Sequence, residues 1–415
     1  MSHLIMLAPA NFGSALAILG KQRVGRLKSW LDGVEPGTGV LDWLELGSAD
    51  SWTLNTKWIH SKGDQIGPKG VFPFVITGEW IDRKFYDHLN PYTGELGSDG
   101  VVRVCAANMN SRYIRLVQEP VRMVSEKSPD ARTLLESLDR PGRSGRKICV
   151  APEFATPKRK FSPKVPLLVV KQKSHSGTSI GILRSVKARV GNKADDQTVG
   201  AILDCMQVKT LLHYAELAKS FRKETKKVQE ADDERIEFED RFLLSDRVFI
   251  RDRHSMIVFR LRDEKGNAIT DYDLLLTANN PDEPEAPPNP NFLPSGLIAD
   301  RQLNTKHGNT LSLYFNYQAL IGLDELTSEG KIVRGKQKAA EHLGFLIRPR
   351  PVEGAVHFLP CELQASREVL QMALQPNQTT LVDIVLRRVV REGVFRLRKG
   401  TKARSFKRDS RGKPL

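Results

Sequence analysis

The stretch "VPLLVVKQKSHSGTSIG", Val165 to Gly181, is the part of the sequence that decides the expected fold. It begins with a short apolar run, "VPLLVV", which is typical of a strand buried in a sheet. The polar residues that follow predict a loop at the carboxyl end of that strand. In open α/β sheets the functional side chains gather at this end of the strands. The stretch therefore predicts an α/β sheet with His175 at its edge.

The same stretch contains a second candidate residue, Ser179, within a match to the G-x-S-x-G pattern. In a true match the serine occupies a sharp turn directly between a strand and a helix. Here a polar loop separates Val170, the last aliphatic residue of the strand, from the serine, and "GTSIGILRSV" places Ser179 in or capping a helix. A nucleophile at this position would also need an acid and a base later in the chain, from Asp300, His307, His342 or His357. Those four residues lie where the sequence has strand periodicity, so the context favours His175 over Ser179 as the catalytic residue.

The length and the composition of the chain limit the class of protein. The chain has 415 residues, which suggests two domains, and 40% of them are hydrophobic, enough for an ordinary core. The start lacks the basic segment of a signal peptide, and no apolar run is long enough to span a membrane. Four scattered cysteines without a C-x-x-C pair indicate reduced thiols and no zinc site. A cytoplasmic protein without a metal is therefore expected.

The net charge of +15 is concentrated at the C-terminus. From residue 391 onward there are ten Lys or Arg against two acids, an excess of eight. We expect residues 401–415 to form a basic disordered tail that is either merely solvated or contacts an anionic membrane surface. No specific nucleic-acid partner is expected.

The periodicity divides the chain into four parts. Residues 1–190 predict an α/β part whose strands lie in the segments 3–15, 70–80, 100–109 and 165–170. Residues 191–242 predict a helical connector, and residues 243–400 alternate with a period of two, as in an all-β sandwich. A hairpin-like turn is expected at Lys265-Gly266-Asn267. The predicted fold class is thus α/β, with a sheet, a helical connector and a sandwich-like C-terminal domain before the tail.

The segment 20–66 is rich in tryptophan, with Trp30, Trp43, Trp52 and Trp58 on short amphipathic stretches. Two interpretations remain open at this point. The tryptophans either fill the core, as most do, or form a lid or cap over an apolar pocket.

Asp99, in "GSDGVV", and His175, in "KSHSG", are each expected beside a strand of the same sheet. A carboxylate that binds an imidazole holds it in one tautomer and stabilises its protonated form, so that the histidine can deprotonate a hydroxyl group. The two residues therefore form a candidate Asp-His pair.

Three stretches resemble one family, the lipase and esterase type of the α/β-hydrolase superfamily. "LIMLAPANFGSAL" is similar to the strand and loop that follow its nucleophile, "GSDGVVRV" to its acid loop, and "KSHSGTSIGILRSV" to its histidine loop. The resemblance covers about residues 1–190 and implies that Asp99 is the triad acid and His175 the triad base. It also implies that this chain corresponds to the C-terminal portion of such an enzyme, with the nucleophilic serine upstream of Met1.

The resemblance implies a serine esterase or lipase that hydrolyses carboxylic esters, such as phospholipids or acyl-glycerols, through an acyl-enzyme and without a cofactor. By itself this chain is expected to be inactive, because the nucleophile lies upstream of it. The alternative is a non-catalytic protein, built on a hydrolase remnant, that binds a membrane, a protein or nucleic acid.

Overall fold

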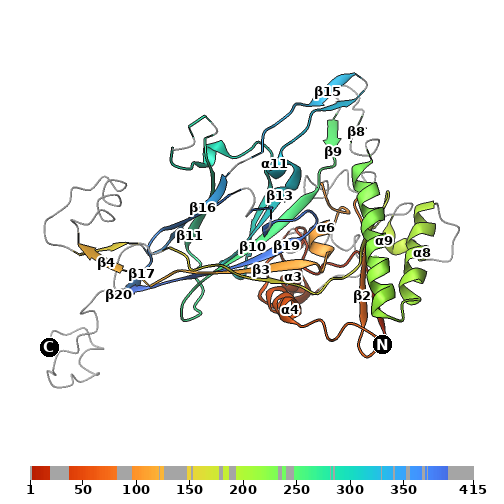
Figure 1. The fold of residues 1–415 in the computed structure, drawn as a ribbon, viewed down its shortest axis with the longest axis horizontal. Helices are drawn as coiled ribbons and strands as arrows, with labels where there is room; N and C mark the ends of the chain where they lie inside the picture. The colour runs from red at the N-terminus through yellow and green to blue at the C-terminus, as the bar shows by residue number, and fades with distance from the viewer. Residues whose placement is uncertain are drawn as a thin grey trace, which may run out of the picture.

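The computed structural model has its elements arranged in layers (Figure 1). The residues that it describes are 2–18, 37–81, 96–120, 122–125, 147–150, 153–176, 181–186, 193–231, 236–239, 247–280, 282–283, 286–328, 330–339, 342–351, 356–366, 370–371 and 373–390. The positions of Trp30, Ser179 and the tail 401–415 lie outside this set.

The first layer is a parallel sheet of three strands in the order β1-β2-β7. Its strands are β1 (His3–Leu7), β2 (Phe72–Gly78) and β7 (Leu167–Val170). Every residue of β2 is buried, as expected for a central parallel strand covered on both faces. The apolar runs at 3–15, 70–80 and 165–170 therefore form one sheet.

Two helices, α8 (Lys193–Met206) and α9 (Leu211–Glu230), cover one face of this sheet. The Thr210 side chain caps α9 by accepting a hydrogen bond from the N–H of His213. Tyr214, Leu217 and Phe221 form the buried stripe of α9 and pack against the sheet. The predicted helical segment is thus a layer of the structure as well as a connection.

The second layer is a mixed six-stranded sheet in the order β12-β13-β10-β19-β3-β6. Its strands are β3 (Ser111–Val117), β6 (Lys158–Phe161), β10 (His254–Asp263), β12 (Ile298–Leu303), β13 (Thr310–Asn316) and β19 (Thr379–Leu386). β19 lies at its centre and is parallel to both β10 and β3. Strands from the N-terminal and the C-terminal half of the chain therefore share this sheet.

The third layer is an antiparallel sheet of β11 (Tyr272–Ala278), β16 (His342–Pro349) and β18 (Cys361–Ser366). A hydrophobic core lies between it and the six-stranded sheet, with Phe259 against Phe345 at 5.5 Å between ring centroids. The mixed α/β fold with a β-rich C-terminal region is confirmed. The turn at Lys265-Gly266-Asn267 is also present, with Gly266 at φ +90°.

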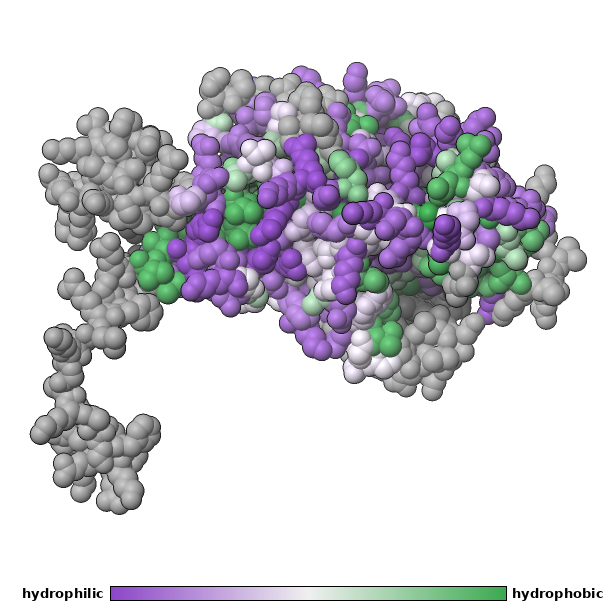
Figure 2. Space-filling model, turned by 60° about the horizontal axis from the view of Figure 1, so that its bottom comes forward, coloured by the Kyte–Doolittle hydropathy of each residue, from purple (hydrophilic) through white to green (hydrophobic). Residues whose placement is uncertain are grey.

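Short elements complete the described part. These are α3 (Thr38–Leu44), α4 (Ala49–His60), α6 (Val104–Ala107), α11 (Tyr317–Ile321), the 3₁₀ turns η2 (Ile182–Arg184) and η3 (Pro290–Phe292), and the strand pairs β4 (Arg122–Ser125) with β5 (Lys147–Val150), β8 (Ile236–Glu239) with β9 (Arg247–Ile250), β14 (Leu326–Ser328) with β15 (Lys331–Arg334), and β17 (Val356–His357) with β20 (Val389–Val390). The face in Figure 2 is mainly hydrophilic, with hydrophobic side chains in separate groups. No helix in the described part is long and apolar enough to cross a bilayer.

The prediction of a strand in the segment 100–109 is wrong. The segment 100–109 forms a turn and the short helix α6. Gly97 and Gly100 adopt φ of +71° and +95°, and the Asp99 carboxylate accepts hydrogen bonds from the N–H groups of Val101 and Val102. These interactions bend the backbone into a loop before a strand can extend.

The sheets do not follow the sequence boundary near residue 190. β3 and β6 precede that boundary but pair in the sheet that contains β10, β13 and β19. One core, which includes Val75, Tyr113, Met256 and Leu381, lies between the parallel sheet and the six-stranded sheet. Of the two interpretations of the tryptophans, filling of the core is the one that Trp52 follows, because it is buried in this same cluster.

Candidate functional site

Asp99 lies in a tight loop that fixes one of its carboxylate oxygens. Its Oδ1 accepts the N–H groups of Val101 and Val102 at 3.0 Å and 2.7 Å. The side chain is completely buried. The second oxygen, Oδ2, is thereby directed to a partner outside the loop.

That partner is His175, in the loop that follows β7. The His175 Nδ1 lies 3.0 Å from Asp99 Oδ2, and the His175 backbone N–H donates to the Asp99 carbonyl oxygen at 2.8 Å. Two hydrogen bonds therefore join loops that are 76 residues apart. The structure brings together the two residues that the sequence singled out.

The pair determines which nitrogen of His175 is available for chemistry. An ionised carboxylate only accepts hydrogen bonds, so Nδ1 carries the proton and Nε2 is left as the basic nitrogen. Burial disfavours the charged imidazole, but the Asp99 charge and hydrogen bond outweigh it and raise the pKa of His175. The side chain is 16% exposed, which leaves it partly accessible. This arrangement can take up a proton at Nε2 and hold the resulting charge.

The end of β2 supports the histidine loop. A Cβ atom on Gly78 would lie 1.8 Å from the Lys173 carbonyl oxygen, so only glycine fits there. The Trp80 N–H donates to the same oxygen at 2.9 Å. β2 therefore holds the backbone two residues before His175.

The six-stranded sheet supports the acid loop. The Tyr314 hydroxyl donates to the Leu96 carbonyl oxygen at 2.7 Å, and a Cβ atom on Gly97 would meet that hydroxyl at 2.5 Å. Arg103, which is 2% exposed, lies 4.1 Å above the Tyr314 ring and forms an ion pair with Asp300. Sequence reasoning missed Arg103 and Tyr314, because nothing in their local pattern indicates a contact across some 200 residues.

The residues considered for a nucleophile at Ser179 lie elsewhere. The Asp300 carboxylate forms an ion pair with Arg103, and His342 is exposed on β16. His307 precedes β13, and His357 lies in β17. Within the described part, no hydrogen bond or ion pair joins these four residues to the Asp99–His175 pair. The described residues also contain no group of three His, Cys, Asp or Glu side chains that could hold a metal ion.

The fold and the site together define a mixed α/β protein with a buried carboxylate–imidazole pair at the end of a parallel sheet. No protein-family model matches the sequence, and neither does any curated protein. Among solved structures, phospholipase PlaB from Legionella pneumophila matches with a TM-score of 0.73 and 38% identity, over 98% of this chain and 74% of the PlaB chain. PlaB in complex with thio-NAD matches with the same TM-score and coverage at 36% identity.

At this identity and coverage the chain belongs to the PlaB family. The predicted lipase-type relationship is therefore correct at the level of the family.

Proposed function

We propose that this chain is the part of a phospholipase that supplies the acid and the base of a serine hydrolase site. The observation that carries the proposal is the hydrogen bond between Asp99 and His175 in a chain 38% identical to phospholipase PlaB. The substrate class proposed is the carboxylic esters of phospholipids. The finer assignment to the α/β-hydrolase superfamily is part of the same proposal.

In this mechanism His175 Nε2 removes the proton from a serine hydroxyl while the serine oxygen attacks the ester carbonyl. The imidazolium, stabilised by Asp99, then donates that proton to the departing alcohol and leaves an acyl-enzyme. A water molecule, deprotonated by His175, releases the fatty acid and restores the serine. We place the serine upstream of β1, as the family resemblance implies.

The test uses the protein encoded by the full gene, with phospholipid hydrolysis in mixed micelles as the readout. His175→Ala should lower the rate by a factor of about 10³ or more, because the proton acceptor is removed. His342→Ala, which removes an exposed histidine on β16, is the matched control and should retain activity. Undiminished hydrolysis by a folded His175→Ala protein would refute the assignment.

A fluorophosphonate probe identifies the nucleophile separately. Mass spectrometry of the labelled protein should find the probe on a serine that precedes β1. Labelling that maps to Ser179, and disappears in Ser179→Ala, would show that the G-x-S-x-G match is the true nucleophile.

A further inference from the structure

A cavity of about 120 Å³ lies between the six-stranded sheet and the sheet of β11, β16 and β18. Its walls are apolar side chains from both sheets, among them Ile114 on β3, Phe259 on β10, Phe345 on β16 and Leu363 on β18. Ligand sites in proteins are typically concave and mostly apolar, with a few polar groups that fix the orientation of the ligand. The cavity therefore has the character of a site for a hydrocarbon group.

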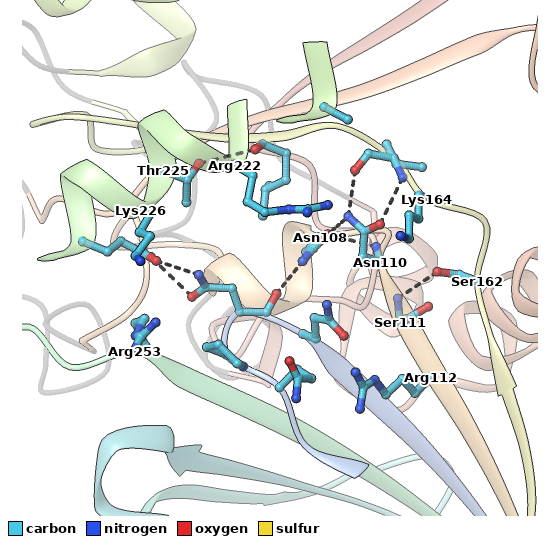
Figure 3. A pocket seen from close by; sticks show the side chains of 18 of the residues that line it. Asn108, Asn110, Ser111, Arg112, Ser162, Lys164, Arg222, Thr225, Lys226 and Arg253 are labelled. Carbon is cyan, nitrogen blue, oxygen red and sulfur yellow. Dashed lines mark hydrogen bonds between the residues drawn. The ribbon is translucent and has the colours of Figure 1, made fainter. Parts of the chain in front are cut away.

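This apolar cavity is separate from the other sites of the molecule. A larger cavity of about 520 Å³, beside α9, is lined by polar side chains such as Asn108, Lys164 and Arg222 (Figure 3). The two cavities share no described lining residue, and neither the Asp99 loop nor the His175 loop contributes to the apolar one. A ligand in the apolar cavity would thus not depend on the proposed hydrolytic function.

The space between the two sheets is incompletely filled by side chains. Ile257, Phe345 and Leu363 line the cavity, yet each is only partly buried. Protein interiors are normally packed as closely as organic crystals, and a void lined by hydrocarbon lowers stability. A hydrocarbon chain in this void would gain the contacts that the walls lack and would be held by the burial of its apolar surface.

One cation stands at the rim of the cavity. Arg159 is exposed on β6, the edge strand of the six-stranded sheet, and lies directly opposite Ile114, so both side chains are on the face that lines the cavity. Among the described lining residues, Arg159 is the only one with a charged side chain. No hydrogen bond or ion pair with another described residue holds its guanidinium. Its N–H donors are therefore available to an anionic group at the rim.

We propose that this cavity binds a fatty acid of medium chain length, with the alkyl chain between the two sheets and the carboxylate on Arg159. A guanidinium binds a carboxylate through two parallel hydrogen bonds. An apolar cavity of about 150 Å³ in another protein binds benzene, so a cavity of about 120 Å³ accommodates roughly five or six carbon atoms. The carbon atoms next to the carboxylate would extend across the rim to Arg159.

Isothermal titration calorimetry on the full chain tests the proposal with decanoate below its micellar concentration. Two further probes separate the parts of the ligand, because butyrate has the carboxylate without the long chain and 1-decanol has the chain without the charge. Decanoate should bind at least tenfold more tightly than either. None of the three is an ester, so the result is independent of the proposed hydrolysis. The proposal is overturned if decanoate does not bind or binds no more tightly than the other two.

The cation is tested by Arg159→Gln, with Lys160→Gln as the matched control. Lys160 is the next residue of β6 and does not line the cavity. We expect Arg159→Gln to weaken decanoate binding about tenfold without changing the binding of 1-decanol, and Lys160→Gln to change either by less than twofold. An equal loss in the two variants would overturn the proposal, since the net charge alone would then explain it.

The apolar part is tested by Ala365→Leu, because Ala365 on β18 lines the cavity and a larger side chain there would occupy the volume that the alkyl chain needs. This variant should weaken the binding of both decanoate and 1-decanol at least tenfold. The control is Ala299→Leu, at an exposed position of β12 that does not line the cavity. Unchanged binding in Ala365→Leu would place decanoate elsewhere and overturn the proposal. Circular dichroism checks folding, and if Ala365→Leu unfolds, the comparison of Arg159→Gln with Lys160→Gln decides.

Discussion

At the scale of single residues, Asp99 determines both the orientation and the basicity of His175. The carboxylate holds the Nδ1 proton and raises the pKa of the imidazole against the opposing effect of burial. A general base works only in its neutral form, so activity should fall as the pH drops through this pKa.

Asp99→Asn tests this role with little change in shape, because an amide oxygen can still accept the N–H groups of Val101 and Val102. We expect phospholipid hydrolysis by the full protein to fall about 10³- to 10⁴-fold. The remaining activity should show its acidic limb at lower pH, since burial without the Asp99 charge lowers the pKa of His175. A pH–rate profile checks this, and an acidic limb that stays in place would exclude Asp99 as the partner that sets the basicity.

His254 should make stability depend on pH. Burial lowers its pKa from 6.5 to about 4, although the Asp252 carbonyl oxygen accepts its Nδ1–H at 2.7 Å. Between these two values the unfolded chain binds a proton that the folded chain does not, so stability falls as the pH falls. The loss should reach about 3 kcal/mol near pH 4.

Chemical denaturation at a series of pH values measures this loss. His254→Phe should flatten the dependence between pH 6.5 and 4, whereas the exposed His342→Ala should leave it unchanged. An unaltered slope in His254→Phe would assign the pH dependence to other groups.

At the scale of elements, the end of β2 places the histidine loop. Gly78→Ala puts a Cβ atom against the Lys173 carbonyl oxygen, so the loop that carries His175 must move. A displacement of about 1 Å in a catalytic group costs on the order of 100-fold in rate. We therefore expect a strong loss of hydrolysis together with a lower melting temperature.

Gly200→Ala in α8 is the matched control, because a Cβ atom there meets no heavy atom within 4 Å. Within a helix, alanine is more stable than glycine by roughly 0.5–1 kcal/mol. This variant should therefore melt at a slightly higher temperature, with unchanged activity. Wild-type activity in Gly78→Ala would show that the His175 loop has room to shift.

At the scale of the whole molecule, contacts between distant parts of the chain hold the layers together. Asp383 on β19 is buried and accepts hydrogen bonds from Tyr113 on β3 and from Arg260 and Arg262 on β10. These interactions hold the pKa of Asp383 below its usual range, although burial alone would raise it. The centre of the six-stranded sheet therefore needs segments from both the N-terminal and the C-terminal half of the chain.

A fragment of residues 1–242 should not fold cooperatively. It loses β19, the parallel partner of β3, and the Met256, Tyr314 and Leu381 side chains of the shared core. Thermal melting followed by circular dichroism should show one sharp transition for the full chain and none for the fragment. A sharp transition in the fragment would mean that residues 1–242 fold without the C-terminal strands.

The sequence by itself determined the local features of this protein. The apolar runs of β2 and β7 follow from the burial of their side chains, so the sequence pattern predicts these strands. Asp99 and His175 were identifiable because "GSDGVVRV" and "KSHSGTSIGILRSV" resemble the acid loop and the histidine loop of the lipase and esterase family. These signals are short-range and can be read in order along the chain.

Only the tertiary structure decided how the segments combine. The helix α6 stands where a strand was expected, because the Asp99 carboxylate accepts hydrogen bonds from its own loop. β3 lies in the same sheet as the C-terminal strands because it pairs with β19. The contact of Tyr113 with Asp383 joins positions 270 residues apart, and that of Arg103 with Asp300 joins positions 197 apart. Pairing over such distances depends on which complementary surfaces meet in the folded chain, and local periodicity does not contain that information.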